Sequence, residues 1–99
     1  MSKPTDGWVY VIANPAWPGY VKIGTTLDLK DRLKVYNTSS PFRDFEVTAA
    51  ARFKDRRAAE RRLHGELRGL RVGRTEWYQL HPADARNHLI RLTKQEQRQ

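Results

Sequence analysis

One carboxylate beside a band of basic residues is the part of this sequence best suited to chemistry. At roughly 100° per residue, Glu60 lies about 60° around a helix from Leu63, at the edge of an apolar stripe. Beyond it on that flank come five basic side chains: Arg71, His64, Arg57, Arg68 and Arg61. A single carboxylate can hold Mg²⁺ when water and a substrate phosphate complete the octahedron, whereas zinc would require more nitrogen ligands. The simpler interpretation is a surface acid paired with a nearby arginine.

A tyrosine and a lysine stand in the middle of two apolar runs nearer the N-terminus. Tyr10 lies within residues 7–13, and Lys22 lies between Val21 and Ile23. An even pairing register would bring Tyr10 and Lys22 side by side on one face of a hairpin. Taken singly, a strand tyrosine is usually a half-buried packing residue, and an alternating lysine usually faces solvent.

Composition and charge limit what these residues could act on. The 99-residue chain has no cysteine, which excludes disulfides, zinc–thiolate sites and cysteine nucleophiles. Its formal net charge of +8 favours a nucleic acid as the partner, although solubility alone would also account for it. No apolar run approaches the roughly 18 residues of a membrane helix, and residues 1–6 lead into no signal-peptide core. We therefore expect no membrane association and a cytoplasmic location.

Two strands and a helix are expected in the first half of the chain. Two β-rich runs flank the loop Asn14–Gly19, which predicts a hairpin over residues 7–24 without fixing its register. A helix capped by Asp28 or a preceding threonine follows and ends at residues 37–41. Its recurring apolar positions are Leu29, Leu33 and Tyr36.

The second half continues this alternation. Phe45–Phe53 predicts a third strand, a helix begins near Asp55, and Glu76–Leu80 predicts a short strand before a last helix opened by His81-Pro82. The inward positions are Ala59, Leu63, Leu67 and Leu70 in the first of these helices and Ala85, Leu89 and Leu92 in the second. The order ββαβαβα predicts an α+β fold with a small, mainly antiparallel sheet of about three core strands flanked by helices. We expect one domain over residues 7–92, between a tail at 1–6 and a frayed polar tail at 93–99.

Five segments, in this order and spacing, resemble the GIY-YIG nuclease superfamily. They are Gly7–Ile12, Val21-Lys22-Ile23-Gly24, Asp28–Leu33, Ala59–His64 and Glu76-Trp77-Tyr78. The chain is more narrowly similar to the small phage- and fungal-type branch, which favours Val-Lys-Ile-Gly as its second motif. The resemblance covers residues 7 to about 80, and the order of the segments is more specific than any one of them.

The resemblance implies a role for each matching residue. Tyr10 stands where the family has the tyrosine that activates the attacking water, and Lys22 stands at the second motif tyrosine, where restriction-type members also use lysine. Arg32 matches the arginine that stabilises charge on the scissile phosphate, and Glu60 matches the glutamate that binds Mg²⁺ or Mn²⁺. A phenol works as a base only where a cation stabilises the phenolate, and arginine fits phosphate oxygens. We expect Tyr10 and Lys22 to be exposed on a catalytic face, with Val21 pointing to the other side.

Two positions depart from the family pattern. Tyr36 stands where many members have a histidine, and it could keep a hydroxyl function or simply pack. Trp77 occupies the region of the family's late asparagine. We treat Tyr36 and Trp77 as auxiliary candidates.

These residues favour a metal-dependent endonuclease that hydrolyses DNA phosphodiester bonds. The alternatives are a catalytically inactive nucleic-acid-binding module on the same scaffold and a basic adaptor for an acidic protein. The five basic residues of the band, His64 included, would bind phosphates without reading sequence, so branched, nicked or single-stranded DNA is a more plausible substrate than a long site. RNA is not excluded as a partner, and we expect a monomer or a weak dimer.

Overall fold

The apolar alternation of the first two strands builds the centre of the sheet. In the computed structural model, which describes residues 4–97, β1 (Gly7–Ala13) pairs with β2 (Tyr20–Thr26). β3 (Glu46–Phe53) adds to β1 and β4 (Trp77–Gln79) to β2, which gives the antiparallel order β3-β1-β2-β4. The predicted α+β fold is confirmed, and a short fourth strand joins the three core strands that were expected.

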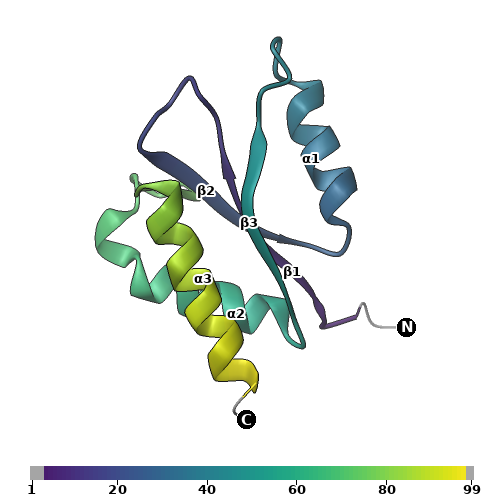
Figure 1. Cartoon of the computed structure of the whole chain (residues 1–99), viewed down its shortest axis with the longest axis vertical. Helices are drawn as coiled ribbons and strands as arrows, with labels where there is room; N and C mark the ends of the chain where they lie inside the picture. Colours follow the sequence, from purple (N-terminus) through teal and green to yellow (C-terminus); the bar gives the residue numbers. More distant parts are fainter. Residues whose placement is uncertain (1–3, 98–99) are drawn as a thin grey trace.

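The helices cover the two faces of the sheet unequally. α1 (Leu29–Thr38) lies on one side, and α2 (Arg56–Glu66) and α3 (Pro82–Gln97) lie together on the other (Figure 1). A 3₁₀ turn, η1 (Arg68–Leu70), follows α2. The element order ββαβαβα is therefore as predicted.

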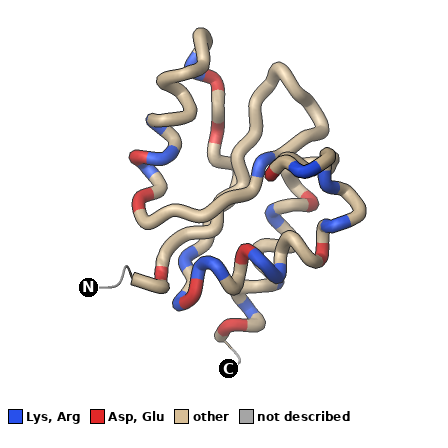
Figure 2. Tube along the Cα trace, turned by 180° about the vertical axis from the view of Figure 1, so that it is seen from behind, with Lys and Arg blue, Asp and Glu red and all other residues tan. Residues whose placement is uncertain are grey.

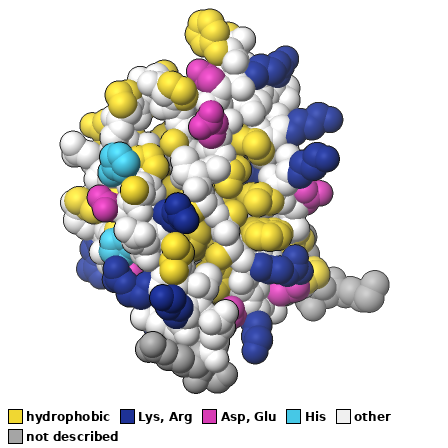
Figure 3. All heavy atoms as spheres, viewed as in Figure 1, with side chains coloured by type: hydrophobic (Ala, Val, Ile, Leu, Met, Phe, Trp, Pro, Cys, Tyr) yellow, Lys and Arg dark blue, Asp and Glu magenta, His cyan; other side chains and the backbone are white. Residues whose placement is uncertain are grey.

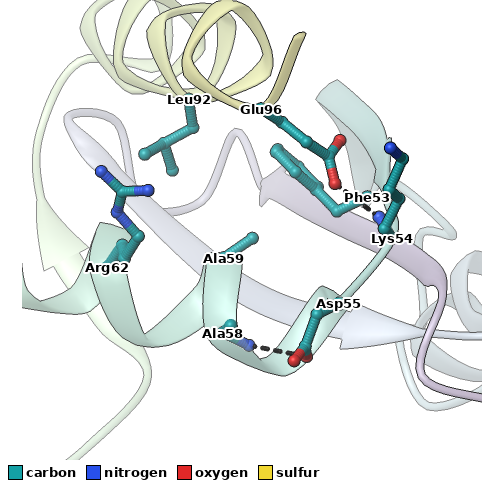
Figure 4. Close-up of a pocket in the computed structure, with 8 residues that line it drawn as sticks. All are labelled: Phe53, Lys54, Asp55, Ala58, Ala59, Arg62, Leu92 and Glu96. Carbon is teal, nitrogen blue, oxygen red and sulfur yellow. Dashed lines mark hydrogen bonds between the residues drawn. The ribbon is translucent and has the colours of Figure 1, made fainter. Parts of the chain in front are cut away.

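Local signals set the helix starts. The Asp28 carboxylate accepts the backbone N–H of Asp31 at 3.0 Å, and the Asp55 carboxylate accepts that of Ala58 at 3.1 Å (Figure 4). Each satisfies one of the backbone donors that the first turn of a helix leaves unpaired. Pro82 occupies the first position of α3, where its missing N–H costs nothing.

The core lies between the sheet and the pair α2 and α3. Its members include Val9, Val11, Val21, Ile23, Leu63, Leu67, Ala85, Leu89 and Leu92. Val21 and Ile23 are fully buried against this side, as predicted. The prediction for Leu70 is wrong, because α2 ends at Glu66 and the tighter 3₁₀ turn rotates Leu70 out of the stripe, leaving it 41% exposed.

The last turns of α3 are tied to α2 and to the turn before it. The Glu96 carboxylate accepts the backbone N–H of Lys54 at 2.7 Å (Figure 4), and Arg62 donates to Gln95 at 2.6 Å. These bonds hold the last turns of α3, so the frayed tail predicted from Thr93 is helical to Gln97. Residues 98 and 99 lie outside the described residues.

A buried arginine anchors the segment before β1. The guanidinium of Arg56 donates to the backbone carbonyls of Pro4 and Asp6, and its backbone N–H donates to the Thr5 carbonyl. Residues 4–6 of the predicted tail are therefore packed, and residues 1–3 lie outside the described residues. Among residues 4–97, the structure has no helix of the length and apolar character needed to cross a bilayer.

α1 is less deeply packed than the other two helices. Leu33 is only partly buried, and Val35 is exposed. A groove of about 520 Å³ between α1 and the sheet is lined by Trp8, Leu33 and Val47, among others. Hydrophobic side chains gather on this side of the molecule (Figure 3). The contacts that α1 makes through its polar side chains therefore matter for its position.

Candidate active site

The register of β1 and β2 places Tyr10 across Gly24. Tyr10 pairs with Gly24, and Ile12 pairs with Lys22. A Cβ at position 24 would lie 2.5 Å from the Tyr10 hydroxyl oxygen and 2.8 Å from its Cζ, closer than non-bonded atoms approach. The glycine of the Val-Lys-Ile-Gly segment is therefore what lets the phenol ring cross β2. Tyr10 and Lys22 point to the same face of the sheet but are not directly opposite each other. Lys22 lies two residues before Gly24, the partner of Tyr10.

The Tyr10 side chain is buried, which corrects the prediction that it is exposed on a catalytic face. Only 3% of Tyr10 is exposed, because its ring crosses β2 at Gly24 and packs against the ring of Tyr36 in α1. Its hydroxyl is hydrogen-bonded to the Tyr36 hydroxyl at 3.0 Å. Burial raises the pKa of Tyr10 above its ordinary value of about 10, and the bond to Tyr36 raises it further, while Arg32 acts in the opposite direction. The phenol is therefore protonated at neutral pH in the free protein.

Three residues complete a phenol cluster around Tyr10. The Nζ atom of Lys22 lies 5.0 Å from the centroid of the Tyr36 ring, within cation–π range. Arg32 is exposed one helical turn before Tyr36, and its charge reaches the Tyr10 hydroxyl. The phenol cluster, defined as Tyr10, Lys22, Arg32 and Tyr36, thus gathers two hydroxyls and two cations between α1 and the sheet.

Glu60 belongs to a second arrangement on α2. Its carboxylate lies 3.5 Å from Nε2 of His64, one turn along the helix, and Nδ1 of His64 is hydrogen-bonded to the Tyr78 hydroxyl. Tyr78 is fully buried, and burial raises the pKa of its hydroxyl, which therefore stays protonated. This Glu60–His64–Tyr78 chain fixes the direction of the carboxylate in the way that second partners orient metal ligands.

The sheet lies between the two arrangements. Tyr10 points toward α1, where its hydroxyl meets Tyr36, whereas Tyr78 points toward α2, where its hydroxyl meets His64. β4 pairs with residues 20–22, so the edge of β2 from Gly24 onward extends past it. Glu76 precedes β4 at this edge, and its charge raises the pKa of both tyrosines. The structure therefore brings Tyr10, Lys22 and Arg32 together on the α1 side of the sheet and places Glu60 on the α2 side.

The predicted basic band remains on the surface. Arg57, Arg61, Arg68 and Arg71 are exposed along α2 and the segment that follows, where Lys and Arg are dense (Figure 2). Arg71 donates to the backbone carbonyls of Thr75 and Arg74, which fixes its side chain over the turn before β4. His64 differs from the arginines because both of its ring nitrogens face protein partners.

A divalent metal at Glu60 would have few protein ligands. Within residues 4–97, no group of three or more His, Cys, Asp or Glu side chains is placed to hold a metal ion. Glu60 has a side chain that is 22% exposed, so solvent reaches it. One accessible hard oxygen ligand fits Mg²⁺ or Mn²⁺, which keep several waters and bind substrate phosphate.

The match to a known family spans both arrangements. The model of the T5orf172 domain matches residues 7–93. The chain belongs to the T5orf172 domain family. This is a phage-associated domain of the nuclease type, so the expected relationship holds at that level. The match begins with β1 and ends at Thr93 in α3. It therefore includes β1, which carries Tyr10, and α2, which carries Glu60. Neither a curated protein nor a solved structure matches the sequence.

Two features of the T5orf172 domain escaped the sequence prediction. The partnership of Tyr78 with His64 joins a strand to a helix 14 residues earlier, and no local pattern signals it. The alternation of Trp77 and Tyr78 was the available clue, since it puts one of the two aromatic rings on the α2 side. The second feature is Glu76, which the sequence presents only as part of the segment Glu76-Trp77-Tyr78. Its place at the edge of β2 follows from the pairing of β4 with β2.

Proposed function

We propose that this T5orf172 domain is a GIY-YIG-type endonuclease that hydrolyses DNA phosphodiester bonds with a divalent metal. The observation that carries the proposal is the phenol cluster. A hydrogen-bonded hydroxyl pair, from the buried Tyr10 and the partly buried Tyr36, is accompanied by the cations of Lys22 and Arg32. Nearby positive charge lowers the free-energy cost of a phenolate, and a tyrosine that served only for packing would need none.

Each member of the cluster has a role in this proposal. Arg32 is exposed and would bind the scissile phosphate, where its planar donors fit two oxygens. Tyr10 would take the proton of the attacking water, with the partly exposed Tyr36 hydroxyl as the relay. Lys22 would assist by stabilising the phenolate. Because the pKa of Tyr10 is raised in the free protein, the base form depends on these cations and on those that arrive with the substrate.

Glu60 would hold the Mg²⁺ or Mn²⁺. The bound ion would stabilise negative charge on the phosphate and on the departing oxygen. His64 and Tyr78 would keep the Glu60 carboxylate pointed in one direction, and Glu76 lies near enough to influence the same edge. The exposed arginines of α2 would supply affinity for the DNA backbone that does not depend on sequence.

An inactive nucleic-acid-binding module is the second candidate. It is favoured by one observation, the location of Tyr10 and Glu60 on opposite faces of the sheet. For catalysis, Tyr10 and Glu60 would both have to act on one phosphate at the open edge of β2. Binding alone would need only the arginines. The first candidate is preferred because a carboxylate held by His64 and Tyr78 repels phosphate unless a metal neutralises it, so a pure binder gains nothing from it.

Nicking of supercoiled plasmid tests the proposal. Wild-type protein is incubated with Mg²⁺ or Mn²⁺ beside the nearly isosteric variants Tyr10→Phe and Glu60→Gln. Glu66→Gln is the matched control, because Glu66 is another α2 acid with a histidine partner, His88. We expect nicking by wild type and Glu66→Gln and none by the two site variants. Retention of DNA without nicking by wild type would favour the binding module, and nicking by Glu60→Gln at the wild-type rate would overturn the assignment of Glu60.

A further inference from the structure

An aromatic groove opens beside the phenol cluster. It has a volume of about 430 Å³ and is lined by Trp17, Tyr20, Val72 and Trp77. Trp17 is 51% exposed, and its ring centroid lies 5.6 Å from that of Trp77 in an edge-to-face arrangement. Rings of this size on the surface leave a large apolar area in water, so the groove is suited to a flat, apolar ligand.

Ring contacts connect the groove to the proposed catalytic residues. The Phe45 ring lies 6.4 Å from that of Trp17 and 5.4 Å from that of Tyr36. Tyr36 in turn contacts Tyr10, and Trp77 pairs directly with Lys22 across β2 and β4. A ligand in the groove would therefore lie next to the place where Arg32 and Lys22 are proposed to meet a phosphate.

We infer that the aromatic groove stacks unpaired nucleobases of single-stranded DNA next to the scissile phosphate. Aromatic rings stack on any base, because every base has a π-face. Cations stand where the backbone of such a strand would run: Lys22 on one side, and Arg71 and Arg74 in the turn that leads to β4. In a duplex the base faces are covered by their neighbours, so only an unpaired segment, as in a branch or a single strand, could enter. This inference rests on the proposed function for the choice of DNA.

A proline-rich peptide is the competing occupant, since such segments also dock between aromatic rings. Two observations favour DNA. The formal net charge of +8 attracts a polyanion rather than a neutral peptide. Ring contacts through Phe45 also join the groove to Tyr36 of the phenol cluster, whose cations would have no partner on a proline-rich chain.

Binding in EDTA tests the inference without cleavage. The probes are a fluorescein-labelled oligothymidine of about 12 nucleotides and an abasic strand of equal length, which keeps the phosphates and lacks the bases. Fluorescence anisotropy compares wild type, Trp17→Leu and Trp17→Phe. Trp17→Leu keeps an apolar side chain without a ring. Because Trp17 is exposed, we expect both variants to fold, and thermal melts check this. Trp8→Leu is the control, because Trp8 lies beside Arg52 on the same face of the sheet but at the other end of β1, away from the aromatic groove.

The expected result is a preference for bases. Wild type should bind oligothymidine about 5- to 100-fold more tightly than the abasic strand, and Trp17→Leu should remove most of that difference. Trp17→Phe and Trp8→Leu should keep it. Equal affinity of wild type for the two strands would overturn the inference, as would tighter, salt-independent binding of a proline-rich peptide. Because no metal is present, failure here leaves the nicking result untouched, and failure of nicking leaves this preference measurable.

Discussion

Gly24→Ala puts the packing of Tyr10 to a quantitative test. The added methyl carbon would lie 2.5 Å from the Tyr10 hydroxyl oxygen, 2.8 Å from Cζ and 3.2 Å from a ring carbon. Carbon atoms in contact are normally about 3.5–4.0 Å apart, so the ring must move by roughly 1 Å. The ring is buried and its hydroxyl is bonded to Tyr36, so this movement breaks or lengthens that bond.

The cost should appear in both stability and activity. Overpacking of this kind lowers the free energy of unfolding by about 1–3 kcal/mol. In a domain of this size the melting temperature should fall by roughly 5–20 °C. Calorimetry measures the fall, and plasmid nicking measures the loss of activity that follows from displacing Tyr10.

Two controls separate the clash from a general effect of alanine. Gly65→Ala adds a methyl group that meets no atom within 4 Å, and because Gly65 lies in α2 the change should raise stability by up to about 1 kcal/mol. In a Tyr10→Val background, Gly24→Ala should cost far less than it does in wild type. Equal costs in the two backgrounds, or a Gly24→Ala protein as stable and active as wild type, would refute the reasoning.

Three further predictions follow from single contacts. Tyr78→Phe removes the hydroxyl that holds His64, so we expect a loss of about 1–2 kcal/mol in denaturant unfolding and a higher Mn²⁺ concentration for half-maximal nicking; an unchanged metal dependence would argue against an orienting role. Arg56→Met leaves two backbone carbonyls without their donor and should lower the free energy of unfolding by about 1–3 kcal/mol, whereas the exposed Arg57→Met should stay within about 0.5 kcal/mol. The raised pKa of Tyr10 means that the folded protein holds this proton more tightly than the unfolded chain, so its contribution is complete below about pH 10 and is lost as pH rises beyond it. Wild type should therefore lose more stability above pH 10 than Tyr10→Phe does, and parallel pH curves would contradict this.

The elements of the fold were predictable because their signals are local. Asp28, Asp55 and Pro82 mark helix starts through chemistry that involves only the next few residues. The end of α2 was harder to predict, because the stripe through Leu67 gives no sign that a 3₁₀ turn follows and exposes Leu70.

The candidate site was predictable in its membership but not in its geometry. The loop Asn14–Gly19 does not determine the offset between β1 and β2, so the crossing of Tyr10 over Gly24 could not be derived. The burial of Tyr10 depends on where α1 docks, which is a tertiary contact. The separation of Tyr10 from Glu60 by the sheet likewise follows from the side on which α2 packs, and a helix with one apolar stripe can pack on either face.

Single-turnover nicking by Tyr10→Phe, Glu60→Gln and the double variant tests most directly whether the two residues act on one phosphodiester from opposite sides of the sheet. If they do, each single change should slow the reaction by about 100-fold or more, and the double variant should be hardly slower than the slower single one. DNA affinity should stay unchanged in all three. A Tyr10→Phe protein that nicks at the wild-type rate, with Glu60→Gln inactive beside it, would contradict the account.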